Sequence, residues 1–330
     1  MPAIIGNPMP LKDTILDPAI PVRFFELVPP PAAKPEAIDD ALEGLGQIQG
    51  MADAINLPEI HDESRGAPRT AEFVERAEPR WIGARIRREL NLEATVNRGV
   101  VYEADQLTWF RETVADFGIS NFILVGGESA DIVYPGPSVS QAARQVREAG
   151  LPVSLGGISI PSRLHEDERI RRKNAAGLSF FTTQVLFDSN DVVWLIQKLN
   201  GLEARLFLSF APVSHPRDLK FLRWLGADIP ADLDRYLLRG EMTRVPKAAS
   251  AAPGEPAPSA DEYLNRSLDL ARRILMDVFD NLPPDPPAIG LNVEHINQRN
   301  FGPAVRMLRE LGNLYTGLVL ARAQKTGTRG

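Results

Sequence analysis

A carboxyl group inside an apolar run is the most informative chemical feature of the sequence. Glu26 lies in the segment Phe24–Val28 (FFELV), between aromatic and aliphatic side chains. Burying an ionised carboxylate costs on the order of several kcal/mol unless a partner offsets it, so such a group is expected to have a raised pKa. A carboxyl group of that kind suits general acid catalysis near neutral pH. An ion pair between Glu26 and an arginine of the barrel core is an equally weighted alternative.

An amide group interrupts a second apolar run. Gln184 lies within Phe180–Phe187 (FFTTQVLF). A primary amide offers a donor and an acceptor together, which matches the edge of a heterocycle. An amide satisfied inside the core is the slightly favoured alternative. Other polar residues follow the strands predicted below and are candidates for a ligand-binding mouth: Glu59, His61, Asn97, Arg98, Glu128, Ser159, Asp188, Ser214, His215, Glu294, His295 and Asn297.

Several kinds of chemistry find no support in the residue types and their spacing. The chain has no cysteine, which excludes disulfides, thiolate metal sites and a cysteine nucleophile. Its histidines form no HxH, HExxH or helical i,i+4 pair, so we predict no metal site. No G-x-S-x-G, Walker A or G-x-G-x-x-G motif stands in the required context. Gly156 and Gly157 are expected to form a tight turn where a ligand can approach the backbone.

Short apolar segments alternate with amphipathic ones along the chain. Their β-branched and aromatic content and their Gly, Pro and Asn borders predict strands at Val22–Val28, Ala54–Ile60, Glu93–Val101, Asn121–Gly127, Pro152–Ser159, Phe180–Val185, Arg205–Val213 and Ala288–Ile296. The clearest helices are predicted at Ala104–Phe117, Ser138–Ala149, His165–Ala176, Asn190–Leu199, Arg217–Leu225 and Asp261–Asn281.

Eight strand–helix units predict a parallel sheet, and at roughly 36 residues each they match a (β/α)8 TIM-type barrel. An open doubly wound sheet is the competitor, but Val22–Val28 runs into three prolines where that fold has a glycine-rich turn. We expect residues 22–311 to form the barrel, with an extra helix and a mobile, Ala/Pro/Ser/Gly-rich loop at 247–260 before the last strand. Residues 1–21 and 312–330 are expected to be a loose N-terminal segment and a C-terminal tail.

The charge balance narrows the classes of partner. Lys and Arg number 37 against 43 Asp and Glu, a net charge of −6. An acidic chain without a basic block is a poor candidate for nucleic acid or an anionic membrane surface. No segment approaches the run of about 18 apolar residues that a membrane span needs. We therefore expect a cytoplasmic protein with a small-molecule partner; an oligomer is compatible with the sequence.

Several segments together resemble the methylenetetrahydrofolate reductase family. Phe24–Pro30 (FFELVPP) resembles the family's first strand, F-E-x-x-P-P. Arg169–Asp188 (RIRRKNAAGLSFFTTQVLFD) resembles its K-R-K, D-A-G-A and T-Q-x-x-F-D signature, and the spacing from Lys173 to Gln184 matches without a gap. Weaker matches follow at Asn121–Ser129, Phe207–Leu233 and His295–Asn300. The resemblance spans residues 22–311 in order.

The departures concern the segments that hold flavin in that family. The Thr-rich loop after the second strand is replaced by INLPEIHDESRG, a histidine strand end by TVNR at Thr95–Arg98, and the flavin loop by GGISIPSRLHED at Gly156–Asp167. The pattern resembles the family's flavin-independent branch, which also has E-L-V-P-P and L-S-F. We therefore lean against bound FAD, although Lys173 corresponds to a phosphate contact of flavin-bearing members.

The resemblance implies reduction of 5,10-methylenetetrahydrofolate to 5-methyltetrahydrofolate with hydride from NAD(P)H. It implies that Glu26 is the general acid and that Glu128, the counterpart of the family's Asp, steadies the cation. The remaining assignments are substrate contacts at Gln184, Asn97, Ser214 and Asn297 and cofactor contacts at Lys173, Gly156 and Gly157. Two alternatives stay open: a tetrahydrofolate-dependent methyl or one-carbon transferase, and a folate-binding protein without turnover.

Overall fold

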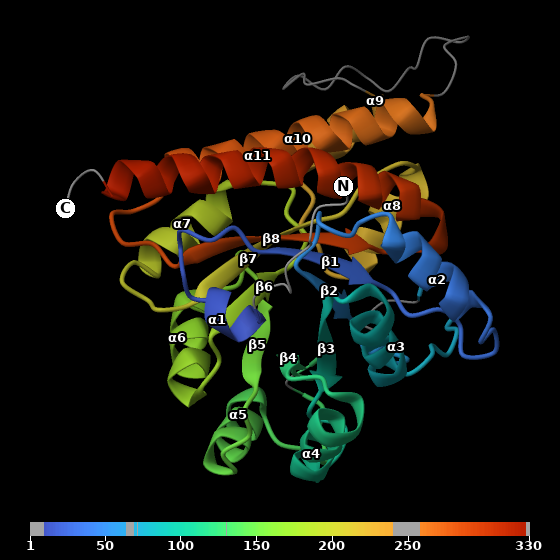
Figure 1. The fold of residues 1–330 in the computed structure, drawn as a ribbon. Helices are drawn as coiled ribbons and strands as arrows, with labels where there is room; N and C mark the ends of the chain where they lie inside the picture. Colours follow the sequence, from blue (N-terminus) through green and yellow to red (C-terminus); the bar gives the residue numbers. More distant parts are fainter. Residues whose placement is uncertain (1–9, 64–68, 71, 130, 240–257, 328–330) are drawn as a thin grey trace, which may run out of the picture.

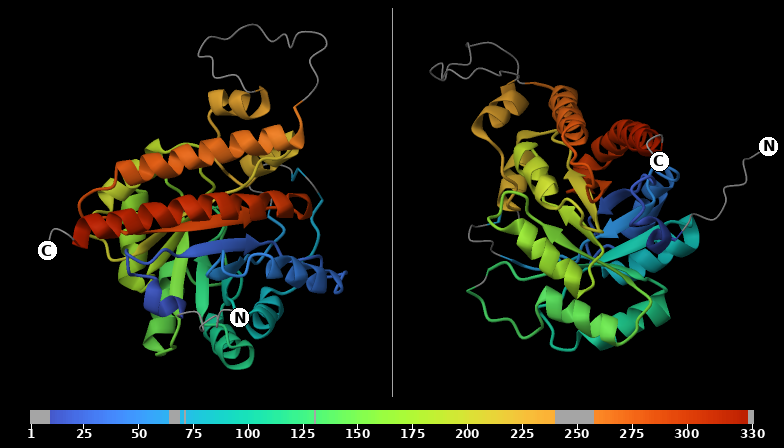
Figure 2. Two further views of the ribbon diagram at one scale, coloured as in Figure 1. Left: turned by 45° about the horizontal axis from the view of Figure 1, so that its top comes forward. Right: turned by 90° about the vertical axis from the view of Figure 1, so that its left-hand side faces the viewer.

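Eight parallel strands close into a barrel in a computed structural model that describes residues 10–63, 69–70, 72–129, 131–239 and 258–327. The strands pair in chain order, and β1 pairs with β8 to complete the ring. Figure 2 gives views of this barrel from two directions. The strands are β1 (Arg23–Leu27), β2 (Ala54–Leu57), β3 (Glu93–Gly99), β4 (Asn121–Val125), β5 (Ser154–Ser159), β6 (Phe180–Thr183), β7 (Arg205–Phe210) and β8 (Ala288–His295). The predicted (β/α)8 barrel is confirmed.

Helices surround the strands, and all but α1 lie on the outside of the barrel (Figure 1). They are α1 (Leu11–Thr14), α2 (Ala37–Gly46), α3 (Pro79–Arg85), α4 (Gln106–Phe117), α5 (Val139–Glu148), α6 (Glu166–Ala176), α7 (Asn190–Lys198), α8 (Pro216–Trp224), α9 (Ala231–Arg239), α10 (Ala260–Asp280) and α11 (Phe301–Gly327). A π-helical turn, η1 (Ile86–Leu90), extends α3, and a 3-10 turn, η2 (Gln298–Asn300), precedes α11. α10 and α11 lie side by side in both figures.

Successive side chains of each strand point alternately out of the barrel and into it, so the strands carry an outward and an inward set of side chains. Outward residues such as Phe25, Leu208 and Val293 join the main core between barrel and helices. Inward residues form successive layers supplied by alternate strands, as the register requires. From the base toward the mouth these are Phe24, Thr95, Gly156 and Phe207; then Asn56, Ile123, Thr182 and Asn292; then Glu26, Asn97, Ile158 and Ser209. The interior thus changes from aromatic to polar as it approaches the carboxyl ends of the strands.

Aromatic rings fill the barrel below the polar layers. Phe24 stacks on Phe207 with ring centroids 4.0 Å apart, and Phe180 meets both rings edge-on. Glycine on the neighbouring, hydrogen-bonded strands makes room for these rings. A Cβ at Gly156 would lie 2.3 Å from the ring of Phe180, and one at Gly290 would lie 2.3 Å from that of Phe207. The polar layers therefore rest on a solid aromatic floor.

Arg205 fastens the N-terminal segment across the base of the barrel. Its guanidinium donates to the carbonyl oxygens of Ile15 at 2.7 Å, Asp17 at 2.6 Å and Ile20 at 3.0 Å, and to Ile289 O at 2.5 Å. The arginine is completely buried, and Leu11 and Ile15 pack into the barrel interior. Residues 10–21 are therefore an ordered plug, and the expectation of a loose segment there is wrong; residues 1–9 lie outside the described part.

The C-terminal half of the chain also differs from expectation. α11 continues to Gly327, so residues 312–327 are helix, not a tail. Tyr315 explains the extension, because this buried side chain donates to Ile289 O at 2.8 Å and accepts from Val22 N. Two helices, α9 and α10, precede β8 where one extra helix is predicted. The predicted loop at 247–260 lies outside the described residues up to 257, and Ser259 caps α10.

Replacing Arg205 by methionine should destabilise the fold. The change leaves several buried carbonyl oxygens at the base without a donor, and each such group costs about 1–3 kcal/mol. We expect a loss of at least about 2 kcal/mol in the free energy of unfolding, measured by urea denaturation. Arg171→Met is the matched control, because Arg171 is exposed and also donates to a carbonyl, Lys198 O. Equal losses in the two variants would contradict the role of Arg205.

Candidate functional site

Two carboxyl groups lie side by side at the mouth of the barrel. Glu26 on β1 pairs in register with Glu294 on β8, and both face inward. Hydrogen-bonded strands lie about 4.8 Å apart, so the two side chains are immediate neighbours. Each is half-buried: protein atoms surround it densely, while part of it remains accessible from the mouth.

The pKa of both carboxyl groups is raised by their surroundings. Burial is the main cause for Glu26, the negative charge of Glu294 adds to it, and the hydrogen bond from Asn56 opposes it in part. Burial likewise raises the pKa of Glu294 to about 7, against the effect of a hydrogen bond with Ser209. Two like charges this close cannot both form easily, so the pair retains a proton near neutral pH.

Amide groups hold the two carboxyl groups in place. Asn56 Nδ2, on β2, donates to Glu26 Oε2 at 2.7 Å. Asn292 Nδ2 donates to Ser209 Oγ at 3.0 Å and to Glu294 Oε1 at 3.3 Å. These donors fix the orientation of each amide and turn its oxygen away from the carboxyl pair.

The alternative that Glu26 is paired with a core arginine finds no support. Among the described residues, neither Glu26 nor Glu294 takes part in an ion pair. The completely buried arginine of the strands, Arg205, is committed to carbonyl oxygens at the opposite end of the barrel. No positively charged side chain of the described residues therefore offsets the negative charge of this pair, and a proton must do so.

Gln184 lies just beyond β6 and makes local contacts. Its Nε2 donates to Leu225 O at 2.9 Å, and its Oε1 accepts from Val185 N at 2.9 Å. The amide therefore ties β6 to the end of α8. The geometry therefore favours the alternative in which the hydrogen bonds of the Gln184 amide are satisfied within the protein, and not the one in which the amide is left free to bind a heterocycle.

Ser214 and Asn297 meet at one carboxylate. Asp218, near the start of α8, accepts from Ser214 Oγ at 3.1 Å and from Asn297 Nδ2 at 3.3 Å. The same side chain accepts from the backbone N–H groups of Ser214 and His215. These contacts join the loops after β7 and β8 and account for both polar side chains within the protein.

Asn97 and Glu128 occupy different environments. Asn97 is buried on the inner face of β3, in the layer of Glu26, and its Oδ1 has no hydrogen-bond partner among the described residues. Glu128 is exposed in the loop after β4, where its backbone N–H donates to the hydroxyl of Tyr134. Asn97 therefore belongs to the inner mouth, whereas Glu128 lies on the surface of the rim.

The residues predicted to contact a cofactor have structural partners. Lys173 Nζ donates to Ile158 O at 2.7 Å, and burial lowers the pKa of this amine. Gly156 and Gly157 lie within β5 and not in a turn, so that expectation is wrong. Phe180 occupies the space over Gly156, and a Cβ at Gly157 would lie 2.7 Å from Leu178. This set does not fit the phosphates of a bound flavin.

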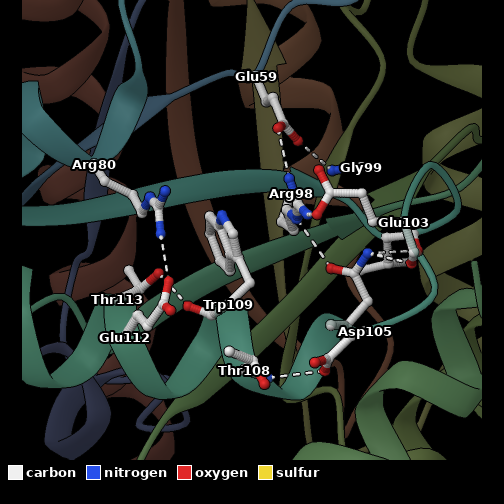
Figure 3. Close-up of polar contacts among 12 residues, drawn as sticks. Glu59, Arg80, Arg98, Gly99, Glu103, Asp105, Thr108, Trp109, Glu112 and Thr113 are labelled. Carbon is white, nitrogen blue, oxygen red and sulfur yellow. Dashed lines mark hydrogen bonds and ion pairs between the residues drawn. The ribbon is translucent and has the colours of Figure 1, made fainter.

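An ion-pair cluster supports the loops beside the mouth, and Figure 3 shows it. Arg98 on β3 is buried and bonds Glu59 at 2.8 Å and Glu103 at 2.8 Å. Burial alone would raise the pKa of Glu59, but the hydrogen bond with His61 and the charge of Arg98 together lower it. Arg98 therefore keeps Glu59 ionised, whereas the carboxyl pair of Glu26 and Glu294 has no such partner among the described residues.

Arg69, which follows β2 in the chain, contacts α8. Arg69 donates to His61 O at 2.6 Å and lies 4.8 Å from the ring of Trp224 in α8. Because α8 follows β7, this contact spans the positions of β1 and β8. A hollow of about 660 Å³ lies beside it, lined by Asp62, Arg69, Thr70, Glu72 and Phe73. None of the inward-facing barrel residues lines that hollow, so the carboxyl pair and not the hollow defines the site.

The described ranges contain no group of three or more His, Cys, Asp or Glu side chains that could hold a metal ion. Nor does any helix within them combine the length and apolar character needed to cross a bilayer.

The fold and its mouth define a (β/α)8 barrel that carries a carboxyl pair on β1 and β8. No family model and no curated protein matches the chain. Among solved structures it is similar to an uncharacterized protein from Clostridium thermocellum that binds two copies of 5-methyl-5,6,7,8-tetrahydrofolic acid. The TM-score is 0.63 at 15% identity, covering 92% of this chain and 100% of that one. This likeness shows the shared barrel fold.

Weaker likenesses carry no argument about this chain. Tryptophan synthase from M. tuberculosis has a TM-score of 0.48 at 12% identity, covering 94% of this chain and 97% of that one. A dihydropteroate synthetase has a TM-score of 0.43 at 12% identity, covering 89% of this chain and 94% of its own.

The stability of the protein should fall as the pH rises through the range in which the pair ionises. Both carboxyl groups have a folded-state pKa above the ordinary value of 4.5, so the folded state binds more protons than the unfolded state above that pH. From pH 5 to pH 8 we expect Glu294→Gln to lose less stability than the unmodified protein, by on the order of 2 kcal/mol. Urea unfolding at the two pH values measures this.

Glu148→Gln, in the exposed end of α5, serves as the control and should keep the original pH dependence. The same pH dependence in Glu294→Gln and in the control would contradict the raised pKa of the pair.

Proposed function

We propose that the protein binds a reduced folate at the mouth of the barrel and reduces 5,10-methylenetetrahydrofolate to 5-methyltetrahydrofolate with hydride from NAD(P)H. The observation that carries the proposal is the inward-facing Glu26 beside Glu294, a carboxyl group whose pKa is raised and which no cation of the described residues neutralises. The sequence resemblance around Phe24–Pro30 and Arg169–Asp188 supports the same chemistry. The folate bound by the similar barrel from Clostridium thermocellum is consistent with this substrate class.

Glu26 would supply the proton that opens the imidazolidine ring of the substrate. The proton goes to the leaving N10, the bond between N10 and the methylene carbon breaks, and a 5-iminium cation forms. Hydride from NAD(P)H then adds to that carbon and completes the methyl group. A carboxyl group with a pKa near the working pH is efficient in such a transfer.

The neighbours of Glu26 would act on the charge that develops. Once Glu26 has given up its proton, the hydrogen bond from Asn56 Nδ2 stabilises the carboxylate. The resulting anion attracts the cationic carbon, and such an interaction is strong in a site with little water. Glu294 lies closer to this charge than the exposed Glu128 does, since it is the register partner of Glu26. We therefore favour Glu294 for the electrostatic role that the resemblance gives to Glu128.

The two alternative functions share the folate and differ in the chemistry. A tetrahydrofolate-dependent transferase needs no hydride donor, and a binding protein without turnover needs no proton donor. Oxidation of NADH or NADPH that depends on 5,10-methylenetetrahydrofolate separates the reductase from both. The raised pKa of Glu26 favours an enzyme, because a binding protein gains nothing from a carboxyl group that is costly to ionise.

Glu26→Gln should abolish most turnover while folate binding survives. The amide keeps the shape and accepts a similar hydrogen bond but cannot donate a proton to the leaving nitrogen. General acid catalysis contributes about 10²–10⁴-fold in rate, so we expect a loss in that range. Turnover is measured by absorbance at the nicotinamide band, and folate affinity and melting temperature are measured on the same preparation.

Glu43→Gln, on the exposed side of α2, is the matched control for this experiment and should keep full turnover. A folded, folate-binding Glu26→Gln protein with more than about a tenth of the original turnover would contradict the acid role, since that loss lies below the expected range. Glu128→Gln and Glu294→Gln, assayed in parallel, compare the two candidates for the electrostatic role.

The purified protein should be colourless. The residues matched to flavin contacts have structural partners here: Lys173 binds Ile158 O, and Phe180 fills the space over Gly156. We expect no absorption band near 450 nm after dialysis. A flavin band at near-stoichiometric occupancy would contradict this expectation and move the chemistry to the flavin-bearing type.

A further inference from the structure

Buried amide oxygens without partners collect at the same mouth as the carboxyl pair. The oxygen atoms concerned are Asn56 Oδ1, Asn97 Oδ1 and Asn292 Oδ1, none of which has a hydrogen-bond partner among the described residues. The three side chains are 1%, 7% and 0% exposed. Leaving a buried acceptor unsatisfied costs about 1–3 kcal/mol, so such atoms in a native fold require an explanation.

The three amides lie on the inner surface of neighbouring strands. Asn56 on β2 pairs in register with Glu26, and Asn97 on β3 lies in the layer of Glu26. Asn292 on β8 is the inward residue directly before Glu294. β8, β1, β2 and β3 are consecutive in the ring, so the acceptors form one continuous arc around Glu26.

The side of the mouth that β4 and β5 form is apolar. The inward residues of β4 and β5 at this level are Ile123, Val125 and Ile158, and the last two are only partly buried. A ligand in the mouth therefore meets an arc of hydrogen-bond acceptors on one side and aliphatic side chains on the other. That division suits a flat heterocycle whose N–H groups lie along one edge.

We propose that the amide oxygens of Asn56, Asn97 and Asn292 recognise the N–H donor edge of the substrate's pterin ring and hold that ring beside Glu26. The assignment rests on the proposed function for the identity of the heterocycle. The 2-amino group and ring N–H groups of a tetrahydropterin are adjacent donors, which is what an arc of acceptors requires. The Nδ2 groups of Asn56 and Asn292 already bond to the carboxyl pair, so their oxygens are the polar atoms of these amides that are left without a partner among the described residues.

Asn97→Ala gives the cleanest test, because no hydrogen bond within the described residues is lost with its Oδ1. Removing a buried, unsatisfied polar atom should leave the melting temperature unchanged or raise it. If the amide recognises the pterin, tetrahydrofolate should bind at least tenfold more weakly to the variant. Isothermal titration calorimetry under anaerobic conditions measures both affinities, and Asn97→Leu provides a second variant of closer volume.

Asn121→Ala is the matched control and should show the opposite pattern. Asn121 is also a buried asparagine on the barrel, but its Nδ2 donates to Glu93 Oε2 at 3.2 Å near the start of β4. Its replacement should lower the melting temperature and leave tetrahydrofolate affinity unchanged. A tetrahydrofolate analogue with a methyl group in place of the 2-amino group should bind the unmodified protein at least tenfold more weakly than tetrahydrofolate.

The outcomes separate this proposal from the proposed reaction. Unchanged tetrahydrofolate affinity in both Asn97 variants would overturn the recognition role, and would indicate that the amide holds structural water. Weakened binding in the variants without any oxidation of NADH or NADPH by the unmodified protein would refute the reductase and leave the recognition role standing. Failure of the unmodified protein to bind tetrahydrofolate would overturn both.

Discussion

The burial of two neighbouring carboxyl groups governs the mouth of the barrel, because burial raises the pKa of both and the negative charge of Glu294 adds to the shift at Glu26. Glu26 and Glu294 stand in register where β1 meets β8, so closing the barrel brings them together. The fold offsets part of the cost with amide donors from Asn56 and Asn292 and supplies no cation within the described residues. A proton retained near neutral pH is the consequence, and proton donation is the chemistry it permits.

The opposite end of the barrel is built on a different principle. Arg205 is as deeply buried as any residue of the core, yet all its donors are satisfied by carbonyl oxygens and the hydroxyl of Tyr315. Below the aromatic layer, Arg205 and Tyr315 make hydrogen bonds that stabilise the fold; above it, the amide oxygens of Asn56, Asn97 and Asn292 have no partner among the described residues. Stability and function are therefore separated along the barrel axis, as is general for (β/α)8 proteins.

The sequence predicts the fold well because eight apolar runs with strand-like composition recur at an even spacing. It predicts Glu26 for the same reason, since a charge among Phe24, Phe25 and Leu27 is conspicuous. Glu294 is no less central, but it follows Asn292 in a strand of mixed character, and only the register of β8 against β1 reveals its importance. Gln184 and Ser214 illustrate the converse: a polar residue at a strand end can be satisfied by a nearby backbone group or by Asp218, and spacing does not show this.

The pairing of the first strand with the last has a consequence for the order of folding. Glu26 and Glu294 are brought together only when β8 closes the ring, and α11 then secures both ends of the chain through Tyr315. Contacts between residues so distant in sequence form late, because a long loop must close first. While the chain is being synthesised, Glu26 is therefore an ordinary carboxyl group without its partner. The raised pKa of the carboxyl pair is therefore complete only in the last stage of folding, when β8 pairs with β1.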